Sequence, residues 1–302
     1  MFEILKKILN KLPYVRTLHK NLATYKKDMH FPPGHFYSPI VSREEIKKKE
    51  HIIWNTAFPE TIEGIDLQVD NQKALLEKLK AYYDEIPFPE SEKKGTRYYF
   101  KNKFYSYTDG ITLYSMLRHF KPKKVVEIGS GFSSAMMLDV NELFLDNQTA
   151  LTFIEPYPTR LNSLITESDK QQTEIIEAFV QNVDMKVFKS LSSGDILFID
   201  SSHIVKTGSD LNHILFHILP QLNSGVLIHF HDVFYPFEYP KRWVLGGFNW
   251  NEDYFLRAFL MYNTDFEVVL FTDYLHKCHS SVFECMPMTY KNTGGNFWIR
   301  KK

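Results

Sequence analysis

The chain has 302 residues, and its 36 Lys and Arg balance 36 Asp and Glu, so the formal net charge at pH 7 is zero. This balance argues against a protein that binds nucleic acid through bulk positive charge. Cys278 and Cys285 are too few for a disulfide framework. The chain also has no apolar run of transmembrane length and no recognisable secretory leader, so we expect a cytoplasmic protein without a nucleic-acid partner.

The first helix that the sequence predicts is amphipathic. Apolar residues recur at helical spacing from Phe2 to Leu12 and would form one stripe. Basic residues occupy or follow the other faces: Lys6, Lys7, Lys11, Arg16 and Lys20. Such a helix can make a weak contact with an anionic membrane surface. Alternatively it packs on its own domain, or on a second copy of the chain in a homo-oligomer.

The next part of the chain predicts an irregular and helical region. Prolines punctuate residues 31–39, which we expect to be extended rather than helical. Ser42 begins a capping box that opens a charged helix. Residues 70–84 carry an apolar stripe at helical spacing. A polar break at 90–95 indicates a boundary, so residues 1–95 are predicted to form a cap region before the main domain of residues 96–302.

The main domain alternates short apolar strands with helices. Strands are expected at 124–128, 151–154, 174–176, 195–199, 225–230 and 266–271, with a last one within 294–300. Helices are expected between them, including 208–219 and 252–262. This alternation is typical of a parallel sheet covered by helices on both faces.

The loop after the first strand indicates a nucleotide-like ligand. Gly129 and Gly131 let a ligand approach the backbone, and a helix that begins near Ser133 offers unpaired N–H donors. Glu127 would repel a pyrophosphate and attract a cationic amino group. Ser134 stands where a dinucleotide fingerprint has its third glycine. The loop therefore favours S-adenosylmethionine over NAD.

Other candidate ligand residues lie where later strands end. Glu155 follows the second strand, where a carboxylate can accept hydrogen bonds from two ribose hydroxyls. Asp200 and His203 follow the fourth strand, and Asp232 follows the fifth. The alternative for each acid is a capping or backbone contact. For Glu155, the expected interval after the glycine loop favours the ribose role.

A divalent metal is a further possibility at these strand ends. Neighbouring parallel strands are about 4.8 Å apart, so Asp200 and Asp232 would share one ion, with His231 or His203 nearby. Oxygen ligands with one imidazole suit Mg²⁺ or Mn²⁺, and less commonly Fe²⁺ or Zn²⁺. The metal would lower the pKa of a substrate hydroxyl. His203 is the alternative, as a general base that removes the hydroxyl proton.

Together these motifs resemble class I S-adenosylmethionine-dependent methyltransferases. The closer resemblance is to a bacterial branch with an Ile-Asp-Ser-Ser-His element, here 199–203, and a terminal Gly-Gly-x-Phe-Trp-Ile-Arg strand, here 294–300. That branch is often encountered near polysaccharide and natural-product pathways. The resemblance implies a Rossmann-like, mostly parallel seven-stranded sheet with helices on both faces, preceded by a helical and irregular N-terminal extension.

The resemblance also implies roles for individual residues, carried over by position. Gly129, Ser130 and Gly131 would contact the methionine moiety, with Glu127 at its amino end and Glu155 on the ribose. Asn182 and Val183 would lie near the adenine. Asp109 would touch the cofactor or cap the helix at 111–119.

In metal-dependent relatives, acids at the positions of Asp200 and Asp232 hold Mg²⁺, whereas His231 stands where such relatives often carry another acid or an amide. Trp243, Asn251 and Glu252 would form the acceptor pocket, or simply cap loops and helices.

The function expected from the sequence is in-line methyl transfer to a hydroxyl oxygen of a saccharide or another small acceptor. His203, or a metal-bound hydroxyl, would handle the proton. Two other classes stay open. One is an oxidoreductase that uses nicotinamide, or iron held by Asp200, His231 and His203. The other is a non-catalytic partner subunit that keeps the fold.

Overall fold

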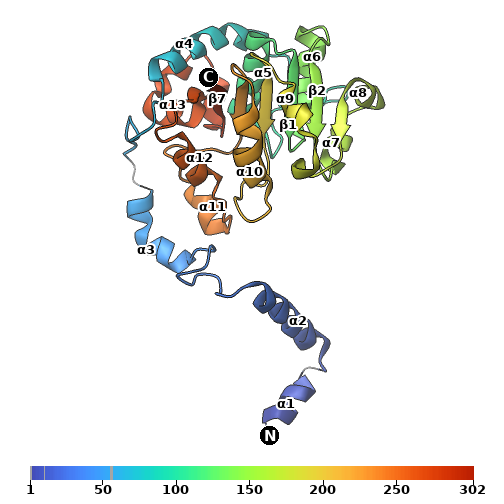
Figure 1. The fold of residues 1–302 in the computed structure, drawn as a ribbon, viewed down its shortest axis with the longest axis vertical. Coiled ribbons are helices and arrows are strands. Elements are labelled where there is room, and N and C mark those ends of the chain that lie inside the picture. The colour runs from blue at the N-terminus through green and yellow to red at the C-terminus, as the bar shows by residue number, and fades with distance from the viewer. Residues whose placement is uncertain (1, 10, 55–56) are drawn as a thin grey trace. The chain divides into compact units, whose positions relative to one another are not determined.

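The computed structural model of the chain describes residues 2–9, 11–54 and 57–302 (Figure 1). It divides into two compact units. The first comprises residues 1–56 with 241–249, and the second comprises 57–240 with 250–302. Each unit is described by itself.

The second unit is built on a seven-stranded sheet with the order β3-β2-β1-β4-β5-β7-β6 (Figure 1). All neighbouring strands are parallel except that β7 runs antiparallel to both β5 and β6. The strands are β1 (Lys124–Ile128), β2 (Ala150–Ile154), β3 (Glu174–Ile176), β4 (Ile196–Ile199), β5 (Leu227–Phe230), β6 (Phe266–Phe271) and β7 (Phe297–Lys301).

Nine α-helices of this unit, among the residues described, precede, connect or follow its strands. They are α4 (Val69–Leu79), α5 (Thr108–Phe120), α6 (Phe132–Phe144), α7 (Thr159–Leu164), α8 (Glu167–Gln172), α9 (Met185–Lys189), α10 (Asp210–His213), α12 (Glu252–Leu260) and α13 (Thr272–Cys278). The chain moves from β1 outward to β3, then returns to add β4 on the other side of β1. Because parallel crossovers are right-handed, this reversal puts helices on both faces of the sheet. The predicted Rossmann-like α/β fold is confirmed.

The strands form where apolar runs were expected, and the central strands are buried between helix layers. All four residues of β4 and of β5 are buried, including His229 of β5. The predicted helix over 208–219 is only partly confirmed. Its α-helical part ends at His213, a π-helical turn covers Ile214–Ile218, and a 3₁₀ turn covers Leu219–Gln221. Pro220 has no N–H to continue the α-helical pattern, which explains why the ladder changes before it.

Residues that precede the predicted domain boundary pack against the sheet. Gln72 of α4 is fully buried. Its side-chain oxygen accepts a hydrogen bond of 2.7 Å from the N–H of Phe271 in β6. The compact unit that contains the sheet therefore begins at Ala57 and includes residues 57–95. The division into functional domains at residue 95 stays a prediction.

The first unit contains α1 (Phe2–Leu9), α2 (Pro13–Asp28), α3 (Arg43–Ile53) and α11 (Lys241–Gly246). The predicted cap of α3 is present, since the Ser42 hydroxyl accepts from the N–H of Glu45 at 3.4 Å. The segment 31–39 is not helical, but it folds into turns instead of extending. The N–H of His35 donates to the Pro32 carbonyl at 3.0 Å, and the His35 ring stacks on Phe31. Among the helices described, none has the length and apolarity needed to cross a membrane.

Candidate active site

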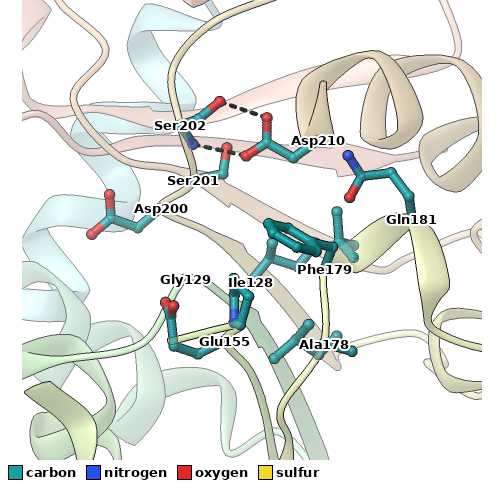
Figure 2. Close-up of a pocket in the computed structure, with 13 residues that line it drawn as sticks. Ile128, Gly129, Glu155, Ala178, Phe179, Gln181, Asp200, Ser201, Ser202 and Asp210 are labelled. Carbon is teal, nitrogen blue, oxygen red and sulfur yellow. Dashed lines mark hydrogen bonds between the residues drawn. The ribbon is translucent and has the colours of Figure 1, made fainter. Parts of the chain in front are cut away.

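Two adjoining cavities open at the carboxyl ends of the strands, where the strand order reverses between β1 and β4. The larger has a volume of about 440 Å³ and the smaller about 240 Å³. Gly129, Glu155 and Asp200 line both, so the cavities form one cleft (Figure 2 shows the smaller). Open parallel sheets bind ligands at this switch point.

The glycine loop of β1 is shaped by its contact with the end of β4. Gly129 has φ +85°, and a Cβ added there would lie 1.8 Å from the backbone oxygen of Asp200. Only glycine fits this conformation and this gap. Ser134 stands at the position of the third glycine in a dinucleotide fingerprint. Its hydroxyl accepts a hydrogen bond of 2.9 Å from the N–H of Gly131 and so caps the start of α6.

Glu127 lies beneath the glycine loop, and its contact with the amino end of a ligand stays a prediction. Its side chain is fully buried and lines neither cavity. One oxygen accepts from the Ser133 hydroxyl at 2.5 Å, and the other accepts from the Ser134 hydroxyl. Burial raises the pKa of Glu127 to about 8. The carboxyl group therefore joins the end of β1 to the first turn of α6.

Glu155 lies where the sequence predicts it. Its carboxylate stands beside Gly129 in the cleft (Figure 2). One oxygen accepts from the N–H of Ser130 at 3.2 Å and the other from the N–H of Tyr157 at 2.8 Å. These two bonds hold the carboxylate in place. Because each carboxylate oxygen has two lone-pair sites, acceptor capacity is left for a ligand.

The contact of Asn182 and Val183 with the adenine stays a prediction, and neither residue lines the smaller cavity. Asn182 is exposed and Val183 is buried. That cavity is lined instead by the preceding residues 178–181, among which Phe179 and Gln181 lie beside it in Figure 2. A 3₁₀ turn at Val180–Asn182 carries the chain away from the cleft after Gln181.

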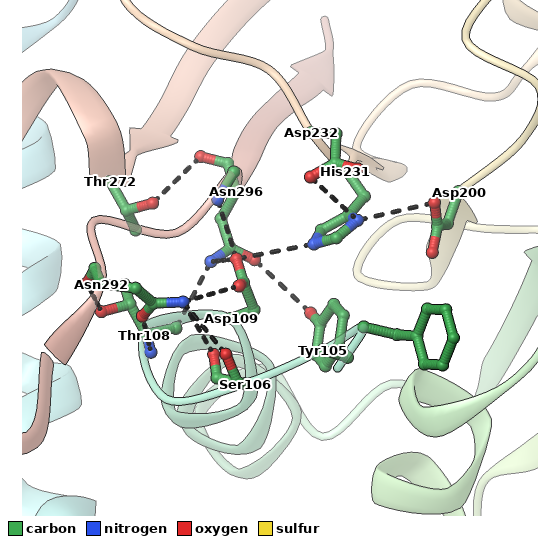
Figure 3. Close-up of polar contacts among 12 residues, drawn as sticks. Tyr105, Ser106, Thr108, Asp109, Asp200, His231, Asp232, Thr272, Asn292 and Asn296 are labelled. Carbon is green, nitrogen blue, oxygen red and sulfur yellow. Dashed lines mark hydrogen bonds and ion pairs between the residues drawn. The ribbon is translucent and has the colours of Figure 1, made fainter. Parts of the chain in front are cut away.

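The predicted metal-ligating residues come together. Asp200, His231 and Asp232 each offer one ligand atom, and these atoms lie within 4.8 Å of one another. His231 Nδ1 is 3.5 Å from Asp200 Oδ1 and 3.7 Å from Asp232 Oδ1 (Figure 3). Neither ring nitrogen of this buried histidine makes a hydrogen bond. Two carboxylates and one imidazole nitrogen with spare coordinating capacity therefore fit a divalent cation.

The charges around His231 favour its cationic form when no metal ion is bound to the neighbouring carboxylates. Burial alone would lower the pKa of His231, but the charges of Asp232 and Asp200 raise it well above its ordinary value. A bound cation requires a neutral imidazole. Metal binding at this cluster would therefore displace a proton.

Asp109 lines neither cavity, and its predicted contact with the cofactor stays a prediction. It lies in the first turn of α5, and its Oδ1 accepts from the N–H of Gly295 at 2.8 Å and from Asn296 Nδ2 at 3.1 Å. The same oxygen is 3.5 Å from His231 Nε2 (Figure 3). Asp109 therefore joins α5 to the segment before β7 and faces the ring nitrogen of His231 that points away from Asp200.

His203 is held between carboxylates. It has φ +58°, its Nδ1 is 2.8 Å from Glu252 Oε2, and its Nε2 is 3.4 Å from Asp200 Oδ1. Burial opposes the charged ring, yet the hydrogen bonds to Asp200 and Glu252 raise the pKa of His203 to about 10. A general base must be unprotonated. These contacts favour the protonated ring, and the role of His203 as a general base stays a prediction.

Two residues predicted for the acceptor pocket instead support His203. The N–H groups of Asn251 and Glu252 both donate to the His203 carbonyl, at 3.1 and 3.3 Å. Asn251 Oδ1 also accepts from the N–H of Val205 at 2.6 Å. Trp243 lies in α11 of the first unit, and its role in an acceptor pocket stays a prediction.

Phe104, Arg160 and Trp250 also line the larger cavity. The Arg160 guanidinium lies 3.7 Å from the centre of the Phe104 ring. The Trp250 ring lies 4.3 Å from that of His203. Phe104 and Trp250 come from loops and Arg160 comes from α7, so the fold brings together residues that are far apart in the sequence.

Comparisons with known proteins agree with this fold. A family model described as "Methyltransferase domain" matches residues 126–233, a range that includes the glycine loop, Glu155, Asp200 and Asp232. A curated protein from Archaeoglobus fulgidus, described as uncharacterised, is 34% identical over 171 residues, which cover 55% of this chain and 76% of the relative. The chain belongs to this methyltransferase-domain family.

Solved structures of methyltransferases are also similar at low identity. The Podospora anserina methyltransferase PaMTH1, bound to S-adenosylhomocysteine, is 16% identical, with 76% of this chain and 88% of that chain covered and a TM-score of 0.43. The O-methyltransferase TomG from Streptomyces achromogenes, in complex with S-adenosylmethionine, is 14% identical, with 75% and 88% covered and a TM-score of 0.40.

Proposed function

We propose that this protein transfers a methyl group from S-adenosylmethionine to a hydroxyl oxygen of a saccharide or another small acceptor. The observation that carries the proposal is the continuous cleft at the strand switch point, in which Gly129, Glu155 and Asp200 are shared by two cavities. A two-part cleft suits a bisubstrate reaction, because one part holds the cofactor and the other presents the acceptor to it. The saccharide class rests on the resemblance of elements 199–203 and 294–300.

The adenosine part of the cofactor fits the smaller cavity. The Glu155 carboxylate, oriented by the N–H groups of Ser130 and Tyr157, would accept hydrogen bonds from the ribose hydroxyls. Phe179 and Gln181 would lie beside the adenine. The methionine part would then extend over Gly129, Ser130 and Gly131 into the larger cavity.

Arg160 is our candidate for the carboxylate of the methionine part. It lines the larger cavity, and its side chain passes Gly131 so closely that a Cβ there would be 3.1 Å from Arg160 Cδ. The Phe104 ring supports its guanidinium by a cation–π contact. A guanidinium beside the glycine loop can pair with a carboxylate through two hydrogen bonds.

We also propose that Asp200, His231 and Asp232 hold a Mg²⁺ or Mn²⁺ ion. When bound, such an ion supplies Lewis-acid chemistry that lowers the pKa of an acceptor hydroxyl. The three side chains already converge, so the site needs little rearrangement beyond loss of the His231 proton. His203, fixed by Glu252, would hold Asp200 in place from the other side at 3.4 Å.

Calorimetric titration of the metal-stripped protein with S-adenosylhomocysteine tests the cofactor. We expect micromolar binding, weakened at least about ten-fold by Glu155→Ala because two charge-assisted hydrogen bonds are lost. Glu177→Ala is the matched control, since Glu177 is exposed and does not line the smaller cavity. Absence of binding by a folded protein would overturn the proposal and favour the oxidoreductase or partner-subunit alternatives.

Transfer of a labelled methyl group tests the acceptor class. Saccharides with free hydroxyls should become labelled, and the label should withstand conditions that remove methyl esters. Label found only on nitrogen, or only on non-saccharide acceptors, would contradict this part of the proposal while leaving the cofactor assignment intact.

A further inference from the structure

The two helices that open the first unit carry an exposed apolar surface. Neither helix has an apolar side chain that reaches the buried class among the residues described. Exposed fractions range from 43% at Leu9 to 74% at Tyr14. The exposed apolar residues are Ile4, Leu5, Leu9, Leu12, Tyr14, Leu18 and Leu22. Apolar side chains exposed to this extent within residues 4–22 are poorly solvated by water.

In α2 the apolar and basic residues lie on opposite sides. Tyr14, Leu18 and Leu22 follow one another at intervals of four, which keeps them within about 80° around the helix axis. Arg16 and Lys20 lie on the opposite side by the same geometry. An amphipathic helix with a basic polar face is typical of helices that lie in the plane of a membrane interface.

The charge of the chain is divided unevenly. Residues 1–28 contain seven Lys and Arg and two Asp and Glu, a net charge of +5. The rest of the chain, with 29 basic and 34 acidic residues, therefore has a net charge of −5. The zero total hides a basic segment that an anionic surface would attract and orient.

We propose that α1 and α2 bind an anionic lipid surface, with α2 lying in the interface plane. Tyr14, Leu18 and Leu22 would enter the boundary between headgroups and acyl chains. Arg16 and Lys20 would stay at the level of the lipid phosphates. This inference concerns the first unit and does not depend on the proposed reaction.

A second copy of the chain is a poorer occupant of this apolar surface. Pairing the apolar faces of two copies would bring together two segments of net charge +5, which repel each other. An anionic bilayer covers the same apolar area and also neutralises the basic residues. The charge distribution therefore favours the lipid surface over a pairing of two apolar faces.

Flotation of the full-length protein with vesicles tests the proposal. We expect at least about ten-fold stronger binding to vesicles of phosphatidylcholine with phosphatidylglycerol than to phosphatidylcholine alone, and weaker binding at high salt. Equal binding to both vesicle types, or binding to neither, would overturn the proposal.

Two pairs of variants separate the apolar and electrostatic contributions. Leu18→Ser with Leu22→Ser should abolish flotation, whereas Leu143→Ser, at a leucine of α6 that is 56% exposed, should not. Arg16→Gln with Lys20→Gln should weaken binding at least about ten-fold. Lys47→Gln with Lys48→Gln, which removes two exposed charges from α3, should have little effect. If the leucine variants instead dissociate a dimer and leave flotation unchanged, the surface belongs to a second copy and the proposal fails.

Discussion

Gly129 and Asp200 are in contact across the strand switch point, so closely that no side chain fits between them. A Cβ at position 129 would stand 1.8 Å from the Asp200 backbone oxygen. The contact joins the ligand loop of β1 to the residue that begins the predicted metal cluster. One backbone position therefore sets the geometry of both halves of the cleft.

Gly129→Ala should destabilise the fold far more than an alanine substitution at another glycine with a similar φ. Gly194 has φ +88°, and an added Cβ there would meet no atom within 4 Å. Gly194→Ala should lower the free energy of unfolding by about 1–2 kcal/mol, from conformational strain alone. Gly129→Ala should lower it by at least about 3 kcal/mol, because the clash adds to the strain. Urea unfolding of both variants measures this difference, and equal losses would show that the contact with Asp200 is unimportant.

The strands and their terminal residues were predictable because burial on both faces demands short apolar runs. Such runs are visible in the sequence, and each strand end then follows directly. Asp200, His231 and Asp232 were grouped correctly for this reason, since β4 and β5 are neighbours. Glu155 was found through its interval from the glycine loop.

Loop paths were not predictable by the same reasoning. Asn182 and Val183, which follow β3, were expected to lie near the adenine. A 3₁₀ turn at Val180–Asn182 places Phe179 and Gln181 in the lining of the smaller cavity. Arg160 reaches the larger cavity only because α7 begins beside the glycine loop. The orientation of Glu127 depends on two serine hydroxyls in the first turn of α6, which no sequence period reveals.

Asp109→Asn should weaken metal binding without affecting cofactor binding. The Asp109 carboxylate is 3.5 Å from His231 Nε2, so it can orient the ring and favour the tautomer that leaves Nδ1 free for a cation. Mn²⁺ titration followed by electron paramagnetic resonance should give an affinity about ten- to one-hundred-fold lower than that of the unmodified protein. Asp200→Asn should abolish the Mn²⁺ signal. Unchanged Mn²⁺ affinity in the Asp109 variant would remove this residue from the metal site.

Arg160→Gln should weaken the binding of S-adenosylhomocysteine but not the binding of a ligand that lacks the amino-acid part. Loss of a charge-assisted pair with the carboxylate should reduce affinity about ten- to one-hundred-fold. Methylthioadenosine has no carboxylate, so its affinity should stay the same in this variant. Glu155→Ala, in contrast, should lower the affinity for both ligands, because both contain the ribose. If Arg160→Gln leaves both affinities unchanged, its guanidinium serves another anion, such as an acidic group of the acceptor.

The buried carboxyl group of Glu127 should make the protein less stable as the pH rises. Burial raises its pKa from 4.5 to about 8, so between these values the native state holds a proton that the unfolded state has released. Stability from this group is therefore fully present below pH 4.5 and is lost as the pH rises through about 8. Glu127→Gln cannot titrate, so its melting temperature should fall less over this range. Glu177→Gln, at an exposed position, should keep the slope of the unmodified protein. Identical slopes in all three proteins would mean that Glu127 is ionised in the native state, with the Ser133 and Ser134 hydroxyls sufficient to stabilise its charge.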